Sequence, residues 1–258
     1  MKAFKLSRCV AAVAMAAVCG AATAAPETFY GYDKGLGNLA RLPSHPLSDL
    51  ARDAFLARLV AGVPTETFEA IAATDAVYAD RNITLTFGAQ QAVLAGWGLV
   101  MDSPPPSTDN PINGIPSGVY PTSGNRAWLS ADDFELRFDE AQVALGFYGV
   151  DIGDFNGQLT LDLVHADAST THVLASSGSR DAGGSVQYFG VLSIDRPFVA
   201  VRFGNSAPVG YDGFVFDDLT IGTAAQIAPV PEPATVVMLL AGLAIVGKLA
   251  RRRLRTPS

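Results

Sequence analysis

The chain has 258 residues, two cysteines and a formal net charge of −7 at pH 7. Between residues 25 and 230 the imbalance is larger, with ten basic against 24 acidic side chains, a net charge of −14. Such an acidic body repels nucleic acid and anionic membrane surfaces, so no nucleic-acid partner is expected, whereas calcium-containing media and uncharged glycans suit it.

Residues 1–24 are typical of a secretory signal peptide. A basic start precedes a short apolar stretch from Cys9 to Cys19, and Ala22-Thr23-Ala24 supplies the small residues that signal peptidase needs. An ordinary N-terminal helix and a lipoprotein site at Cys19 are the alternatives, although Val18 is bulky for the second. Removing the peptide removes both cysteines, so no disulfide is expected in the mature chain.

Residues 25–64 are expected to form a lead-in to the main domain. Residues 26–43 show no clear period and predict a loose segment. An amphipathic helix follows, with Pro46 in its first turn and Gly62 as its stop. Its apolar stripe consists of Leu47, Leu50, Ala51, Ala54, Phe55 and Leu59.

From Thr65 to residue 224 the period changes to two, which predicts half-buried antiparallel strands. The alternating stretches are NITLTF, FELRF, QLTLDLV and FVAVRF, and the continuously apolar VALGFYGVDI predicts a central strand. About nine or ten strands must close into a barrel or pack as two sheets. We favour an all-β, antiparallel, jelly-roll-like β-sandwich over residues 65–224.

Turn residues divide these strands. Asn156-Gly157 predicts a β-hairpin between VALGFYGVDI and QLTLDLV. Further turns are expected at 166–170 and 180–185. The stretch 102–125 carries six prolines and predicts a long surface loop, because proline cannot donate to a sheet.

The C-terminal part predicts a membrane anchor. Residues 225–233 form a linker. The apolar run 234–247 has 14 residues and reaches 17 with Lys248, Leu249 and Ala250, at the lower limit for a transmembrane helix over residues 234–250. The basic tail 251–258 contains Arg251, Arg252, Arg253 and Arg255. These arginines are expected to stay in the cytoplasm, which places the body outside the inner membrane.

Pro231 and Pro233 flank Glu232 and keep this segment extended and accessible, which a simple anchor does not require. The order of VPEPA, an apolar helix and a terminal arginine cluster closely resembles the PEP-CTERM sorting signal of Gram-negative bacteria. The resemblance implies that Pro231, Glu232 and Pro233 are recognised by an exosortase after Sec export, and that the tail is removed during surface delivery. Residues 47–222 also resemble uncharacterised ectodomains of such proteins, which supports a β-sandwich.

Catalytic motifs are not evident in the body, so an enzyme is not expected. His45, His165 and His172 lie at no metal-ligand spacing. The chain contains no G-x-S-x-G and no phosphate-binding glycine loop. A hydrolase would need two paired carboxylates, which spacing alone cannot identify.

A calcium site is the one cofactor prediction. Strand alternation would put Asp217 on the same face as Val215, Leu219 and Ile221, so a buried Asp217 needs a partner. The arrangement resembles the structural calcium site of jelly-roll carbohydrate-binding modules, with Glu69 as the second ligand and Asp218 or Asp212 completing it. The alternative is that Asp217 and Asp218 accept hydrogen bonds without a metal. Residues 151–157 are interpreted as a turn.

Exposed aromatic rings would favour glycan binding, because they stack on sugar faces. The candidates are Trp97, Trp128, Tyr120, Tyr148, Tyr188 and Tyr211, of which Tyr120 and Tyr211 lie in predicted loops. We therefore expect an exported surface or extracellular-matrix protein, structural or adhesive in exopolysaccharide or biofilm. A calcium-supported carbohydrate-binding module is the alternative, and a matrix polysaccharide hydrolase is the third hypothesis.

Overall fold

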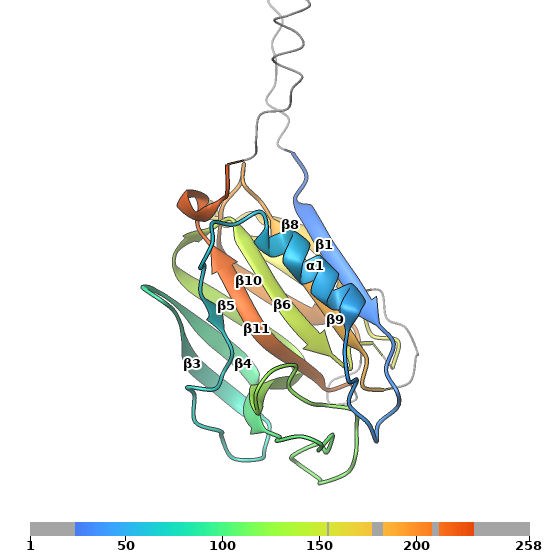
Figure 1. Ribbon diagram of the computed structural model, residues 1–258. Helices are drawn as coiled ribbons and strands as arrows, with labels where there is room; N and C mark the ends of the chain where they lie inside the picture. Colours follow the sequence, from blue (N-terminus) through green and yellow to red (C-terminus); the bar gives the residue numbers. More distant parts are fainter. Residues whose placement is uncertain (1–23, 154, 177–182, 208–211, 230–258) are drawn as a thin grey trace, which may run out of the picture.

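The fold is taken from a computed structural model, which describes residues 24–153, 155–176, 183–207 and 212–229. These residues form eleven strands, one α-helix and one 3-10 turn (Figure 1). The elements are β1 (Glu27–Asp33), α1 (Pro46–Leu56), β2 (Thr65–Glu66), β3 (Ala79–Phe87), β4 (Gln90–Asp102), β5 (Arg126–Gln142), β6 (Ala144–Val150), β7 (Leu159–Val164), β8 (Thr170–Ser176), β9 (Val186–Leu192), β10 (Phe198–Asn205), β11 (Phe214–Gly222) and η1 (Ala224–Gln226).

All pairings between these strands are antiparallel, and they join into one nearly barrel-like sheet. The long strands β4 and β5 pass from one layer to the other. The first part of β5 pairs with β11 at Trp128–Ser130, and its later part pairs with β10 at Phe134–Arg137. The prediction of an all-β antiparallel fold is confirmed, although the two layers are parts of one sheet.

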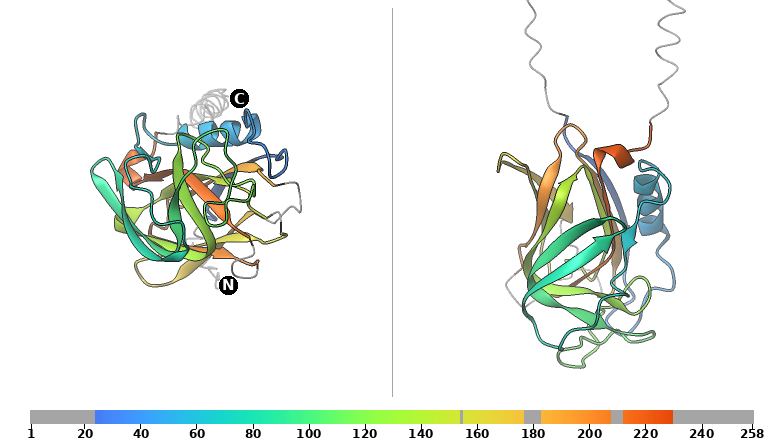
Figure 2. Two further views of the ribbon diagram at one scale, coloured as in Figure 1. Left: turned by 90° about the horizontal axis from the view of Figure 1, so that it is seen from below. Right: turned by 90° about the vertical axis from the view of Figure 1, so that its left-hand side faces the viewer.

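We name the layers by their surroundings. The helix-side sheet contains β1, β9, β6, β11 and the first part of β5; the open sheet contains β8, β7, β10, the rest of β5, and β3 with the paired part of β4. Figure 2 shows α1 against the outer face of the helix-side sheet, with the open sheet on the opposite side of the molecule. The helix-side sheet is therefore covered on both faces.

An aromatic core fills the space between the two layers. The rings of Phe134 and Phe203 stack at 4.2 Å between centroids, and Phe147 and Phe216 of the helix-side sheet lie edge-on against Phe203 at 5.4 and 5.5 Å. Two predicted strand faces also pack into this core, which confirms that they point inward. They consist of Ile83, Leu85 and Phe87, and of Leu159, Leu161 and Leu163.

A second core lies between α1 and the helix-side sheet. Phe55 is inaccessible to solvent and packs over Gly146 and Gly190. A Cβ atom added to either glycine would lie 2.7 Å from the Phe55 ring, so the helix can approach the sheet this closely only because both residues are glycine. This contact fixes α1 on the sheet.

The predicted helix is confirmed, but its buried face is narrower than the predicted stripe. Ala51 and Phe55 are buried and Leu59 is buried just beyond the last turn, whereas Leu47 and Leu50 are 57% and 68% exposed. Helical spacing placed all of these residues in one stripe. The sheet covers only part of that stripe, so spacing alone could not separate the buried residues from the exposed ones.

The prediction of a loose lead-in over residues 26–43 is wrong for its first part. β1 pairs with β9 from Glu27 to Asp33, at the edge of the helix-side sheet. No side chain fits at Gly31, where α1 passes over β1, because a Cβ atom there would lie 2.1 Å from the Leu47 carbonyl oxygen. The close helix contact thus removes the alternation that would have indicated a strand.

The predicted hairpin at Asn156-Gly157 is also wrong, although the turn exists. Asn156 has a φ of 66° and donates its backbone N–H to Gly153. β6 pairs with β9 and β11, whereas β7 pairs with β8 and β10. The turn therefore lies in a connection between the two layers, because β6 belongs to the helix-side sheet and β7 to the open sheet.

The predicted turn at 166–170 is confirmed as the β7–β8 connection. Within the part of the chain that the structure describes, no helix is long and apolar enough to cross a membrane. The predicted transmembrane helix 234–250, the motif 231–233, the basic tail 251–258 and residues 1–23 of the signal peptide lie outside the described residues.

Candidate functional site

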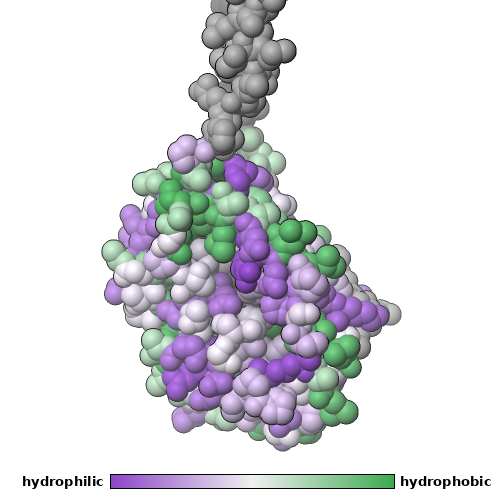
Figure 3. Space-filling model, viewed as in Figure 1, coloured by the Kyte–Doolittle hydropathy of each residue, from purple (hydrophilic) through white to green (hydrophobic). Residues whose placement is uncertain are grey.

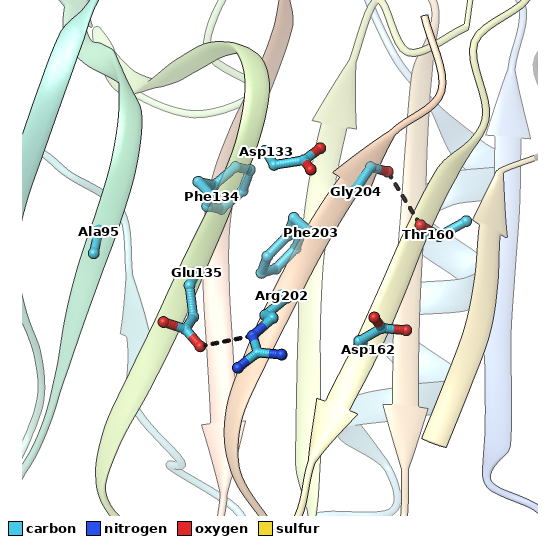
Figure 4. A pocket seen from close by; sticks show the side chains of 9 residues that line it. All are labelled: Ala95, Asp133, Phe134, Glu135, Thr160, Asp162, Arg202, Phe203 and Gly204. Carbon is cyan, nitrogen blue, oxygen red and sulfur yellow. Dashed lines mark hydrogen bonds and ion pairs between the residues drawn. The ribbon is translucent and has the colours of Figure 1, made fainter. Parts of the chain in front are cut away.

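A cleft of about 330 Å³ lies on the solvent face of the open sheet (Figure 4). We call it the sheet cleft. β10 runs through its centre, with β5 on one side and β7 on the other. Its lining residues are Ala95, Asp133, Phe134, Glu135, Thr160, Asp162, Arg202, Phe203 and Gly204.

The cleft is hollow because its central positions have small or inward-pointing side chains. Ala95 and Gly204 contribute almost no bulk, and the rings of Phe134 and Phe203 are 5% and 2% exposed. Glu135 and Asp162 flank Arg202 in the strand register and border the hollow. Alternation along three strands thus produces a polar cleft above an aromatic floor.

Ion pairs fix the charged walls of the cleft. Arg202 Nε donates to Glu135 Oε1 at 3.1 Å, and Arg137 Nε binds the other oxygen of the same carboxylate. Asp162 Oδ1 lies 2.8 Å from His172 Nδ1. Charges of alternating sign therefore cross the sheet from β5 to β7, with His172 of β8 bonded to the last of them.

Two further polar groups at the cleft are held by hydrogen bonds. Thr160 Oγ1 donates to the Gly204 carbonyl at 3.3 Å, and Asp133 Oδ1 accepts the Asn205 N–H at 2.9 Å. The cleft presents guanidinium donors beside carboxylate acceptors in fixed positions. That combination suits a ligand with many hydroxyl groups, which donate and accept at once.

The predicted calcium ligands Glu69 and Asp217 both bind the loop that precedes β5. Glu69 Oε1 accepts the N–H groups of Asn125 and Arg126 at 2.8 and 2.6 Å. Asp217 Oδ2 accepts the N–H groups of Thr122 and Ser123 at 2.8 and 3.0 Å. The two carboxylates thus hold the two halves of residues 122–126.

Asp217 and Asp218 accept further hydrogen bonds. Asp217 Oδ2 also accepts the Thr122 hydroxyl at 2.9 Å, and its Oδ1 accepts the Asp218 N–H at 2.8 Å. Asp218 Oδ1 accepts the Ser123 hydroxyl at 2.8 Å. This is the hydrogen-bonded arrangement that the sequence left open as the alternative to a metal.

The predicted facing of β11 is wrong. Val215 packs in the core beneath α1, whereas Leu219 and Ile221 pack in the core between the layers. A bulge between Asp217 and Thr220, with Asp218 at a φ of 49°, inserts an extra residue and exchanges the two faces. Asp217 therefore points toward the α1 side.

The buried acidic pair has perturbed pKa values. Burial, with the charge of Asp218 beside it, raises the pKa of Asp217 to about 8, against the hydrogen bonds it accepts. Burial also raises the pKa of Asp218. Among the described residues, no group of three or more His, Cys, Asp or Glu side chains could hold a metal ion. The calcium site stays a prediction.

A polar cluster lies next to this pair, under the start of α1. Tyr148 donates its hydroxyl to Asp49, which also lies 3.0 Å from His45 Nδ1. The Arg52 guanidinium lies 5.8 Å from the centre of the Tyr148 ring. Burial raises the pKa of Tyr148 and of Tyr188, so both phenols stay protonated at neutral pH. These contacts hold the helix start on the sheet.

The other histidines have structural partners. Both ring nitrogens of His165 are in hydrogen bonds, Nδ1 with the Pro197 carbonyl at 2.9 Å and Nε2 with the Thr171 hydroxyl at 2.8 Å. His165 is 3% exposed. It therefore fixes the β7–β8 turn, and only His172 reaches the edge of the sheet cleft.

The aromatic glycan candidates are mostly in the core. Tyr120 is 3% exposed and donates its hydroxyl to the Gly184 carbonyl at 2.8 Å, so its prediction as an exposed platform is wrong. Trp128, Tyr148 and Tyr188 are buried as well. Trp97 is half-buried and stacks on Tyr78 at 4.6 Å. Tyr211 lies outside the described residues.

Sequence reasoning missed the sheet cleft. Glu135, Asp162 and Arg202 are the polar positions of alternating strands, which sequence alone identifies only as solvent-facing. The missing information is the register that pairs Arg202 with both carboxylates. Opposite charges at the centres of three alternating strands were the one available signal.

The chain leaves the body through a strap beside the end of α1. The Val60 N–H donates to the Gln226 carbonyl and the Ala228 N–H to the Arg58 carbonyl, both at 2.8 Å. Pro231 follows Ala228 by three residues.

Comparison with solved structures gives weak similarities. The K2 cleaved adhesin domain of Lys-gingipain is 14% identical, with 63% of this chain and 99% of that chain covered and a TM-score of 0.35. The CBM22-1 xylan-binding domain from Paenibacillus barcinonensis Xyn10C is 9% identical, with 65% and 94% covered and a TM-score of 0.33. A CBM29-2 variant complexed with mannohexaose is 14% identical, with 63% and 92% covered and a TM-score of 0.29.

At these TM-scores the similarities carry no argument about what this chain binds. No curated protein matches the chain. The C-terminal segment gives the informative match, because residues 229–254 fit the family described as the PEP-CTERM protein-sorting motif. That motif implies export, a C-terminal membrane-anchoring signal and processing by an exosortase. The chain carries a PEP-CTERM sorting signal behind a β-sandwich-like body.

Proposed function

We propose that this exported protein is delivered to the cell surface or extracellular matrix and acts there as an adhesive domain that binds uncharged exopolysaccharide. The sorting motif supports delivery. The observation that carries the binding role is the sheet cleft, where Arg202 lies between Glu135 and Asp162 on the one sheet face that α1 does not cover.

The geometry of the cleft suits a neutral polymer. Each carboxylate already has a partner, Glu135 in Arg202 and Asp162 in His172, so hydroxyl groups can exchange hydrogen bonds with them without leaving an isolated charge. The acidic body disfavours an anionic polymer. An extended sugar chain could lie across β5, β10 and β7, since the cleft is open along the sheet face.

The position of the chain ends fits surface display. The start of β1 and the turn η1, where the described chain begins and ends, lie at the same end of the body, and the β4–β5 connection lies at the opposite end (Figure 1). In our proposal Arg251, Arg252, Arg253 and Arg255 keep the tail in the cytoplasm before processing. The inner membrane then holds the body outside until the exosortase acts at Pro231–Pro233.

A glycan array probed with the full chain in detergent tests the binding role. We expect retention on neutral polysaccharides, loss of retention in Arg202→Ala, and unchanged retention in Thr84→Ala, an exposed position elsewhere on the open sheet. Equal retention of both variants would contradict the sheet cleft as the site. Release of reducing ends from a retained polymer would instead support the hydrolase alternative.

Calcium support is proposed separately, through Glu69, Asp217 and Asp218. If calcium binds there, EDTA lowers the Tm of the protein and added calcium restores it, and Glu69→Gln removes this response. An unchanged Tm in EDTA contradicts the calcium site. The array with and without calcium shows whether the ion also affects glycan binding.

Tail removal is proposed from the proline-flanked segment. Intact-mass measurement of protein recovered from the outer surface should give a chain that lacks residues 234–258. A Glu232→Ala variant should accumulate uncut in the inner membrane if this segment is recognised. A surface form that still carries Arg255 contradicts removal.

A further inference from the structure

A second cavity, with a volume of about 370 Å³, lies among the loops at one end of the body. We call it the loop-end pocket. Figures 1 and 2 show the loops of this end opposite the start of β1 and η1. Its lining residues are Asn38, Tyr78, Asn110, Ile112, Asn113, Ser117, Val119, Asp151, Phe155 and Gly213.

The long connection between β4 and β5 forms one wall of this pocket and is internally bonded. The Asn110 N–H donates to the Ile115 carbonyl at 2.9 Å, and the Ser117 N–H donates to the Thr108 carbonyl at 3.0 Å. Arg41 Nε donates to the Ser107 carbonyl at 2.6 Å and attaches the loop to the body. The wall is thus formed before a ligand arrives, which reduces the entropic cost of binding.

Amide and phenol groups give the pocket its polar character. Asn110 Oδ1 accepts the Ile112 N–H at 2.9 Å, and Asn113 Oδ1 accepts the Ile115 N–H at 3.0 Å. These bonds use the oxygen of each amide and so orient its NH₂ group as the donor for other partners. Burial raises the pKa of Tyr78 to about 12, so its hydroxyl is a neutral donor and acceptor.

Apolar surface lies beside these groups. Phe155 is 61% exposed at the pocket and Ile112 is 39% exposed. Tyr78 is backed by Trp97, whose ring stacks on it at 4.6 Å with an angle of 26°. An exposed ring next to several hydrogen-bond donors and acceptors is the combination that binds a sugar ring, with one apolar face and a polar edge.

The charge of the pocket selects against anions. Asp151 is the one charged side chain among the lining residues, and it accepts the Gly184 N–H at 2.7 Å. The lining includes no lysine or arginine to pair with a carboxylate or phosphate. The hydrophilic character of this end is visible in Figure 3, where purple and pale residues dominate the lower part of the molecule.

We propose that the loop-end pocket binds a neutral sugar residue, at the end of a glycan chain or as a branch. It is a second site, separate from the sheet cleft and built from different segments. Two sites on one body would let a single copy connect two polysaccharide chains, with the avidity that bivalent binding gives. The two sites share no lining residue, so the pocket can bind a second chain while the sheet cleft is occupied.

Tryptophan fluorescence gives a readout specific to this pocket. The chain has two tryptophans, of which Trp128 is buried in the core and Trp97 stacks on the lining residue Tyr78. We would titrate the full chain in detergent with the methyl glycosides of glucose, galactose, mannose and xylose. We expect a saturable change in emission with at least one of them, and no change in Trp97→Phe.

Variants then locate the ligand. Phe155→Ala should raise Kd by roughly fivefold to tenfold, because one aromatic stacking contact is lost. Ile115→Ala, in the β4–β5 connection but outside the pocket lining and 58% exposed, should leave Kd unchanged, as should Arg202→Ala in the sheet cleft. These two controls separate failure of this site from failure of the sheet cleft.

Three results would overturn the proposal. The first is no saturable change with any of the four glycosides. The second is an unaltered Kd in Phe155→Ala, which would place the ligand elsewhere. The third is binding of galacturonate as tight as that of the neutral glycosides, which would show that the pocket does not select against anions.

Discussion

The two layers of the sheet differ in how much of their surface is buried. Every residue of β6 and of β9 in the helix-side sheet is buried, whereas β7 in the open sheet alternates between buried and half-buried positions. The difference arises because α1 and the long loops cover one layer on its outer face. The covered layer provides stability, and the open layer keeps a face on which a ligand can bind.

The charges follow the same division. The helix-side sheet encloses Asp217, with no solvent exposure and a raised pKa, next to the second core. The open sheet carries Glu135, Arg202 and Asp162 as a partly exposed row. A buried carboxylate couples stability to pH, whereas a solvated ion pair contributes little to stability and stays available for binding.

The largest expected effect is on the helix-side core. Phe55→Ala should lower the free energy of unfolding by about 3–5 kcal/mol, because it leaves a cavity over Gly146 and Gly190. Leu50→Ala, on the same helix but 68% exposed, is the matched control and should cost less than about 0.5 kcal/mol. Urea unfolding followed by far-UV circular dichroism measures both. Equal losses would show that α1 does not cover this sheet as described.

A smaller effect over any one pH unit is expected from the titration of Asp217. The pKa of Asp217 is about 8 in the folded protein, above its value in the unfolded chain, so the folded state binds the extra proton. Its contribution is present below about pH 4 and is lost as pH rises through 8, with a slope of at most about 1.4 kcal/mol per pH unit.

Two variants isolate this contribution in unfolding measurements across pH. Asp217→Asn should flatten the slope above pH 4, and Asp218→Asn should shift it to lower pH by removing the neighbouring charge. Asp167 in the β7–β8 turn provides the opposite sign, because the Ser169 hydroxyl and N–H lower its pKa. Its contribution is lost as pH falls. A wild-type slope retained in Asp217→Asn would contradict the assignment.

The smallest effect on stability is expected in the open sheet. Arg202→Ala removes an ion pair whose arginine side chain is 58% exposed, so the free energy of unfolding should fall by no more than about 1 kcal/mol. The difference from wild type should shrink at high salt. A loss as large as that of Phe55→Ala would show that the row of charges stabilises the fold and is not mainly a binding surface.

Periodicity predicted the strands of the open sheet well, because each has one solvated face. Periodicity failed at positions where a contact with another segment or a bulge determines the residue type. Gly31 and Gly190 lack side chains because α1 packs against them, and the extra residue at Asp218 exchanges the two faces of β11. Such departures depend on contacts with distant segments, which a local pattern does not contain.

The same reasoning explains which candidate sites could be predicted from the sequence. Glu69 and Asp217 were paired from sequence, and the structure shows that both bind residues 122–126. The sheet cleft was not found, because it requires Glu135, Asp162 and Arg202 to meet through strand register. The loop-end pocket was not found either, because its lining residues come from five separate connections between strands and helix.

The sequence by itself determined the all-β antiparallel class, the helix before it and the PEP-CTERM sorting signal, because alternation, helical spacing and a linear motif are local properties. Only the tertiary structure decided which strands pair, which face of α1 is buried and where the two cavities lie. These depend on contacts between residues far apart in the chain, whose free energies exist only once the sheet has folded over its aromatic core.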